Sequence, residues 1–127
     1  MLKLLVIGCG GFIGAVLRYL VSGLVQNLSG SIRFPFGTLA VNVIGCLFIG
    51  LLVYLVETRS MLSVTVRMFV FIGLLGSFTT FSTFGNETLE LLRDSKTTLA
   101  LLNAGAQLFL GLAAVWLGRM IAYGIWR

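Results

Sequence analysis

Four long runs of apolar residues, separated by short polar interruptions such as QNLSGS and ETRS, dominate the chain. A helix that crosses the hydrocarbon core of a bilayer needs about 20 apolar residues, because each residue adds about 1.5 Å to its length. Each run meets that length. The pattern predicts one all-α membrane domain over residues 1–127, with transmembrane helices at about 2–25, 37–56, 62–92 and 97–125.

The third run differs from the others because its middle is not plainly hydrophobic. Gly73, Gly76, the string TTFSTF and Gly85 fall where an unbroken span would carry Leu, Ile or Val. Backbone groups released by a helix break in a membrane need partners from protein or from an ion, since lipid offers none. We expect a third helix broken at its centre and facing something polar. The alternative is a continuous helix whose hydroxyls bond to their own carbonyls.

Two further runs carry polar side chains at helical spacing. Thr38, Asn42 and Gly45 fall at i, i+4 and i+7 of the second run, and Asn103 and Gln107 fall at i and i+4 of the fourth. Buried amides often serve only to bond helices together. Two such stripes beside a broken helix favour a lined pathway. Small residues that would let helices approach closely are Gly10, Gly14, Ala15, Gly45, Gly50, Gly111, Ala114 and Gly118.

Composition supports a membrane protein and excludes several functions. Apolar residues make up 58% of the chain and charged residues 10%, and the mean hydropathy is +1.07. The net charge of +5 comes from scattered residues that form no basic patch of the kind nucleic acid requires. With no histidine, no nucleophile beside a base and no metal-ligand spacing, the chain is not expected to be an enzyme.

The basic residues show no preference for one side of a four-pass topology. A chain without such a bias can insert in both orientations, and two opposite copies can pack about a two-fold axis in the membrane plane. We therefore expect an antiparallel homodimer. Of the nine basic residues, Lys3, Arg59, Arg67, Arg119 and Arg127 fall on one side, and Arg18, Arg33, Arg93 and Lys96 on the other.

The acidic residues lie near span ends or beyond the expected break, so none is expected at the midplane of the bilayer. Cation exporters and proton-coupled antiporters usually depend on a buried acid. Neutral donors suit an anion or a neutral solute instead. The acidic residues are Glu57, Glu87, Glu90 and Asp94, and the neutral donors are Asn42, Thr79, Thr80, Ser82 and Thr83.

Two phenylalanines and one arginine are further candidates for contact with an ion. Phe81 and Phe84 are spaced i, i+3 and so share one side of a helix. The edge of a benzene ring is positive, so it can contact an anion, although paired rings also serve simple packing. Arg18, deep in the first run, either reaches the membrane surface, ties helices together or raises the potential at a pore mouth.

Three segments resemble the Fluc (CrcB-type) fluoride channels of bacteria. They are GGFIGAVLRY (10–19), GTLAVNVIG (37–45) and GLLGSFTTFSTFGNE (73–87), in this order and spacing. The TTFSTF string with the upstream VN pair is the most specific of these signals. The resemblance implies a dual-topology dimer in the bacterial inner membrane with two antiparallel pores, through which fluoride leaves the cell down its electrochemical gradient and relieves toxicity.

The resemblance also implies roles for individual residues. Phe81 and Phe84 would meet those of the second subunit along the fluoride path, and Asn42 would be a polar pore residue. Main-chain carbonyls of Gly76 and Thr79 would bind a central structural sodium ion. Further residues expected along the pathway are Thr38, Thr80, Ser82 and Thr83, with Arg18, Asn103 and Gln107 as possible vestibule or pore-lining residues.

Two other functional classes are alternatives to a fluoride channel. A small four-helix drug exporter also inserts in both orientations, but it would need a midplane Glu in the first helix, where this chain has Gly and Arg. An accessory subunit of a larger membrane complex would leave the polar stripes without a role.

Overall fold

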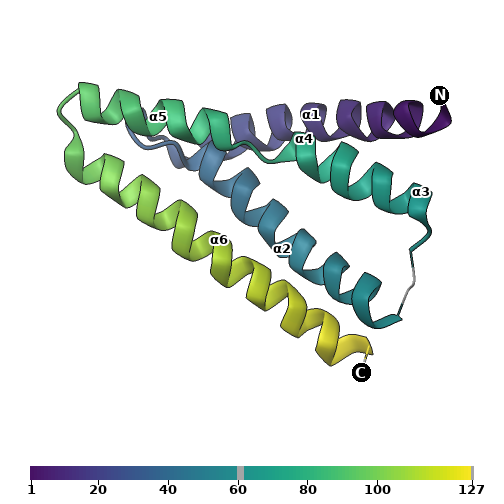
Figure 1. Ribbon diagram of the computed structural model, residues 1–127. Helices are drawn as coiled ribbons and strands as arrows, with labels where there is room; N and C mark the ends of the chain where they lie inside the picture. The colour runs from purple at the N-terminus through teal and green to yellow at the C-terminus, as the bar shows by residue number, and fades with distance from the viewer. Residues whose placement is uncertain (60–61, 127) are drawn as a thin grey trace.

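The computed structural model describes residues 1–59 and 62–126, which are helical apart from short connections (Figure 1). Four helical spans are long and apolar enough to cross a membrane: Leu2–Ser29, Phe36–Thr58, Val64–Arg93 and Thr97–Trp126. The prediction of an all-α fold with four membrane spans is confirmed. The elements are α1 (Leu2–Ser29), α2 (Phe36–Arg59), α3 (Val64–Arg67), η1 (Met68–Leu75), α4 (Gly76–Phe78), α5 (Phe81–Arg93) and α6 (Thr97–Trp126).

The first helix continues past its predicted end at residue 25. It stops at Ser29, where Gly30 adopts the left-handed backbone conformation with φ of 62° and its amide bonds to the carbonyl of Asn27. Glycine reaches that conformation without steric cost, which makes it a common helix terminator. The polar residues of QNLSGS mark where the helix leaves the apolar environment, and the helix itself ends later. Arg127, included in the charge count above, lies outside the described residues, as does the side chain of Arg59.

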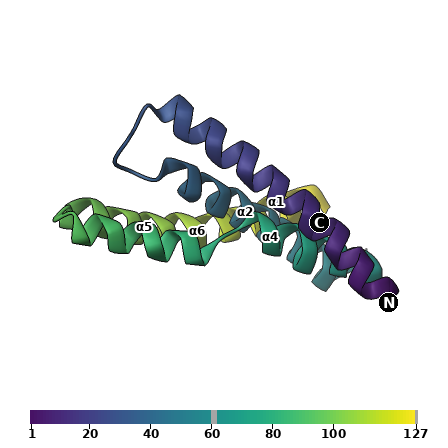
Figure 2. The same ribbon diagram turned by 90° about the horizontal axis from the view of Figure 1, so that it is seen from above.

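The helices form two packed pairs that diverge from one end of the molecule. α1 lies along η1 and α4, and α2 lies along α6 (Figure 1). Both termini lie at one end, and the α5–α6 turn lies at the other (Figure 1). Seen from above, the α1–α2 connection is at the same end as α5 (Figure 2). The polar residues of α5 and the start of α2 are therefore gathered at that end.

Glycines allow the backbones of each pair to touch. A methyl group added at Gly14 would lie 2.2 Å from the carbonyl oxygen of Leu74 in η1, and one added at Gly50 of α2 would lie 2.1 Å from that of Val115 in α6. No real side chain tolerates such a contact. The expectation that small residues bring these helices close is confirmed at both positions.

The third span is broken within the TTFSTF string, as predicted, and its glycines remain helical. The backbone is extended at Thr79 (φ −86°, ψ 158°) and at Thr80 (φ −151°, ψ 112°), between α4 and α5. Gly73 and Gly76 stay helical before the break, and Gly85 is helical after it. Threonine is β-branched and suits extended backbone. Gly73 instead serves packing, because an added methyl group would lie 2.6 Å from a carbonyl oxygen of α1.

Candidate ion pathway

The helix break is stabilised by the side chain of Asn42, which comes from the second turn of α2. Its Oδ1 accepts the backbone amide of Thr80 at 2.8 Å, and its Nδ2 donates to the carbonyl of the same residue at 3.1 Å. One side-chain amide thus bonds to both backbone polar groups of Thr80, the N-cap residue of α5. The Thr80 amide would otherwise lack a partner in a bilayer, so Asn42 stabilises the break.

Two backbone amides at the break donate to side chains instead of to the carbonyls that they would reach in a continuous helix. In an unbroken helix the amides of Thr80 and Thr83 would bond to the carbonyls of Gly76 and Thr79. Here the Thr80 amide donates to Asn42, and the Thr83 amide donates to Oγ1 of Thr80 at 3.2 Å. Both carbonyls therefore lack their usual helical donor. Oxygen atoms of this kind suit a hard cation such as sodium.

A cavity of about 530 Å³ lies on one side of the break, between α2, α4, α5 and α6. The rings of Phe81 and Phe84 meet edge to face there, with centroids 5.4 Å apart. The helix that follows the break places both rings on one side, as the spacing predicts. Phe81 is 81% exposed in the single chain, so this cavity has an unpartnered aromatic rim. The lining also includes Asn42, Gly76, Thr79, Thr80 and Gln107.

Gln107 brings an amide from α6 to the same cavity. Its Oε1 accepts a hydrogen bond from Nδ2 of Asn42 at 3.0 Å, whereas its Nε2 is buried and has no hydrogen-bond partner in the described part of the chain. A buried donor without an acceptor is energetically costly. The neutral donor that is available to an anion here belongs to Gln107, because the amide of Asn42 is already bonded to Thr80 and Gln107.

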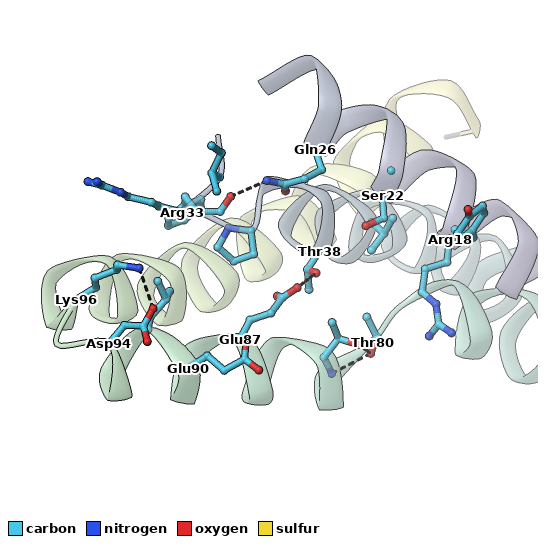
Figure 3. A pocket seen from close by; sticks show the side chains of 18 of the residues that line it. Arg18, Ser22, Gln26, Arg33, Thr38, Thr80, Glu87, Glu90, Asp94 and Lys96 are labelled. Atoms are coloured by element: carbon cyan, nitrogen blue, oxygen red, sulfur yellow. Dashed lines mark hydrogen bonds and ion pairs between the residues drawn. The ribbon is translucent and has the colours of Figure 1, made fainter. Parts of the chain in front are cut away.

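A second cavity, of about 690 Å³, lies between α1, α2 and α5, at the end of the molecule that holds the α1–α2 connection. Arg18, Thr38 and Thr83 line it together with acidic residues of α5 (Figure 3). Thr80 lines both cavities, and its side chain is almost completely buried. Thr80 therefore lies between the two cavities at the break, beside Asn42.

Glu87 lines this larger cavity, whereas its position in the sequence predicted only a charge beyond the helix break. Thr38 of α2 donates from Oγ1 to Oε1 of Glu87 on α5 at 2.7 Å, and the two side chains point toward each other (Figure 3). The other carboxylate oxygen, Oε2, is buried without a hydrogen-bond partner among the described residues. The spacing could have indicated this position, since Thr80, Thr83 and Glu87 follow at i, i+3 and i+7 on one helical face.

The mouth of the larger cavity carries charges of both signs. Glu90 and Asp94 of the α5 end face it, and Arg33 and Lys96 belong to its rim. Lys96 binds Asp94 at 2.9 Å and holds the pKa of that carboxyl below its usual value. The mouth is thus not simply electropositive. Arg18 from α1 is the basic residue that the sequence singled out, and it lines this cavity.

Two predicted pathway residues lie outside both cavities. Ser82 is exposed on α5, with its hydroxyl 3.4 Å from that of Thr80. Asn103 is completely buried between helices, where its Nδ2 donates to Oγ1 of Thr88 at 3.0 Å. In the single chain, Asn103 therefore joins α6 to α5, the helix-bonding alternative that its sequence pattern left open.

Comparison with known proteins assigns the family. Residues 5–119 match the family described as CrcB-like protein, Camphor Resistance (CrcB). The chain belongs to the CrcB-like family. Its relatives include "Fluoride-specific ion channel FluC 3" of Methanosarcina barkeri, 45% identical over 98% of this chain and 93% of that protein. "Fluoride-specific ion channel FluC 1" of Methanosarcina acetivorans is 46% identical over 98% and 94%.

This CrcB-like chain also has bacterial relatives of the same kind. "Fluoride-specific ion channel FluC" of Shewanella sp. strain W3-18-1 is 45% identical over 97% of this chain and 98% of its own length. These matches confirm the family that the TTFSTF string indicated. Together with the four apolar spans, they establish a multi-pass membrane protein whose named relatives are channels rather than enzymes.

Proposed function

We propose that this protein is a fluoride-selective passive channel. The observation that carries the proposal is the position of Thr80, which lines both cavities and has its backbone bonded to Asn42 at the helix break. A passive pathway needs a continuous series of polar contacts, none so strong that it traps the ion. Relatives that are nearly half identical over almost the full chain are named as fluoride-specific channels.

The proposed route runs from the larger cavity past the break to the rings of Phe81 and Phe84 in the smaller cavity. Fluoride is small and strongly hydrated, so hydroxyls and amides must replace the water it loses. Near the break, Gln107 offers a buried donor, and the edge of a ring beyond it offers partial positive charge without the binding strength of a full cation. The proposed pathway residues are Thr38, Asn42, Thr80, Phe81, Thr83, Phe84 and Gln107, with Arg18 at the vestibule.

The channel is proposed to be an antiparallel homodimer. Phe81 leaves most of its ring uncovered at the edge of the smaller cavity, and a second copy would cover that ring and close the cavity. The nearly even distribution of basic residues permits both insertions. Cysteines placed singly on the same loop and labelled from each side of the membrane would test this. Labelling from one side alone would contradict dual topology.

A structural sodium ion at the dimer centre is proposed on the released carbonyls of Gly76 and Thr79. The residues fit such an ion, because both oxygens are neutral, hard ligands whose helical donors are engaged elsewhere. An ion bound only by the assembled protein would raise its stability in proportion to the logarithm of the ion concentration. An unfolding midpoint that is the same in sodium and in N-methylglucamine would contradict the site.

The direction of transport follows from acid chemistry and membrane potential. Hydrogen fluoride is a neutral weak acid that enters cells from acidic surroundings and dissociates inside. A negative interior then drives the anion outward, with about 2.3 kcal/mol for each 100 mV. A passive channel in the cell (inner) membrane would therefore export fluoride and protect the cell from its toxicity.

The deciding experiment is efflux from liposomes that contain the purified protein. Potassium fluoride, potassium chloride and an organic cation salt should be compared under the same voltage, set by valinomycin. We expect rapid fluoride release and neither chloride nor organic cation release above that of protein-free liposomes. Equal release of fluoride with and without protein would reject the channel, and cation release would favour the drug exporter.

A further inference from the structure

Gln26 makes three hydrogen bonds from the last turn of α1. Its Nε2 donates to the carbonyl of Ser31 at 2.6 Å and to that of Phe34 at 3.1 Å, and its Oε1 accepts the amide of Gly37 at 3.0 Å. The side chain is half-buried and lines the larger cavity (Figure 3). The side-chain amide of Gln26 thus bonds to two residues of the α1–α2 connection and to the start of α2.

The bond to Gly37 satisfies one of the first amides of α2. The first amides of a helix have no partner within it, and α2 receives one acceptor from α1 rather than from its own preceding residues. Gly37 also lies so close to α1 that an added methyl group would be 2.4 Å from the carbonyl of Ser22. Ser22 and Gln26 are one helical turn apart. The start of α2 is therefore attached to α1 at two successive turns.

The next residue of α2 is Thr38, which donates to Glu87 in the larger cavity. A continuous series of contacts therefore runs from Gln26 through the Gly37 amide to Thr38, and from there to α5. This series joins the three helices that enclose the cavity. The backbone of Thr38 directly follows the Gly37 amide, which Gln26 holds in place. The Thr38 hydroxyl therefore has little freedom to shift relative to Glu87.

We propose that Gln26 is a positioning residue for the ion pathway, which holds the hydroxyl of Thr38 at its place opposite Glu87. It makes no contact with the ion in this role. The inference rests on the proposed fluoride conduction and adds to it a residue of α1 that contributes through α2.

A residue that only closes a loop would behave differently from one that acts through Thr38. Loss of an independent stabilising contact combines additively in free energy with the loss of Thr38, so the two reductions in flux would multiply. If Gln26 acts by placing the Thr38 hydroxyl, removing that hydroxyl first leaves Gln26 nothing to place. The combined variant should then resemble the Thr38 variant alone.

The test is a double-mutant cycle of Gln26→Met, Thr38→Val and their combination, measured by fluoride efflux from liposomes. Met matches the length of Gln and keeps the packing, but it removes all three hydrogen bonds. We expect Gln26→Met to reduce the flux roughly fivefold or more, within the range of coupled contacts. The combination should conduct like Thr38→Val. Asn27→Ala, an exposed neighbour on α1, is the control and should conduct like the unchanged protein.

Each outcome decides the inference. Unchanged flux in Gln26→Met, or reductions that multiply in the combination, would overturn it while leaving fluoride conduction by the unchanged protein intact. An unchanged protein that does not conduct fluoride would instead overturn the proposed function. If Gln26→Met does not assemble, Gln26→Asn repeats the cycle with an amide one methylene shorter. Failure of both variants to assemble would make Gln26 a folding residue and reject the positioning role.

Discussion

The two halves of the third membrane span are held in place by different forces. Before the break, η1 lies against α1 through glycines, with backbone touching backbone. After it, α5 is attached to its neighbours by side-chain hydrogen bonds, from Thr38 to Glu87 and from Asn103 to Thr88. The first half should therefore be sensitive to added volume and the second to lost polarity. A pathway at the junction therefore has a tightly packed helix on one side of the break and a helix held by hydrogen bonds on the other.

The largest effect should come from adding volume to the first half. Gly14→Ala places a methyl group 2.2 Å from the carbonyl oxygen of Leu74. The contact is with backbone, so no side chain can move aside to relieve it. Overpacking typically costs about 1–3 kcal/mol, and contact with backbone belongs at the upper end. The measurement is the unfolding midpoint in detergent.

Matched glycines test whether volume is the cause. Gly8→Ala on the same helix and Gly85→Ala in α5 meet nothing within 4 Å in the single chain. Both should change the unfolding free energy by about 1 kcal/mol or less, with helix propensity favouring alanine. A Gly14→Ala protein as stable as these two would refute the claim that close packing fixes the first half.

The junction should lose function when its amide is removed. Asn42→Leu deprives the Thr80 peptide of both partners and Gln107 of one. Each buried polar group left unsatisfied costs about 1–3 kcal/mol, so the break should shift or close. We expect fluoride efflux to fall at least tenfold while the protein still elutes as one assembled species. Asn27→Leu, exposed on α1, is the control; equal flux in the two variants would exclude Asn42 from the pathway.

Phe81→Ile should separate function from stability in the second half. The ring is mostly uncovered in the single chain, so its replacement should alter the unfolding free energy of one subunit by about 0.5 kcal/mol or less; a larger loss in the assembled protein would come from the proposed contact between subunits. Loss of the positive ring edge should nevertheless reduce efflux about tenfold. Phe12→Ile, a similarly exposed change on α1, should leave efflux unaltered. Normal efflux from Phe81→Ile would remove this ring from the proposed route.

The smallest effect is expected from the hydrogen bond between Asn103 of α6 and Thr88 of α5. Asn103→Leu and Thr88→Val each remove one side of it, and such interhelical bonds average about 0.6 kcal/mol in membranes. A double-mutant cycle on the unfolding free energy measures their coupling. Zero coupling would show that α5 is held by other contacts, and the distinction between the two halves would weaken.

The sequence alone determined the membrane spans, the small-residue contacts and the position of the anomalous segment. These features depend on local composition and on helical spacing, which one run of residues contains in full. The TTFSTF string also indicated the family. The side of α5 that carries both phenylalanines followed from their spacing, because they lie within a single helical turn.

Only the tertiary structure decided which polar groups meet. Asn42 lies 38 residues from Thr80 and 65 from Gln107 along the chain, and no local pattern states that one amide would bond to both. For the same reason, the sequence predicted Glu87 only as a charge near a span end, and no local pattern indicated a role for Gln26. The break lies within the TTFSTF string, as predicted, but its position at Thr79 and Thr80 depends on the partner that Asn42 supplies and on the packing of Gly73 against α1.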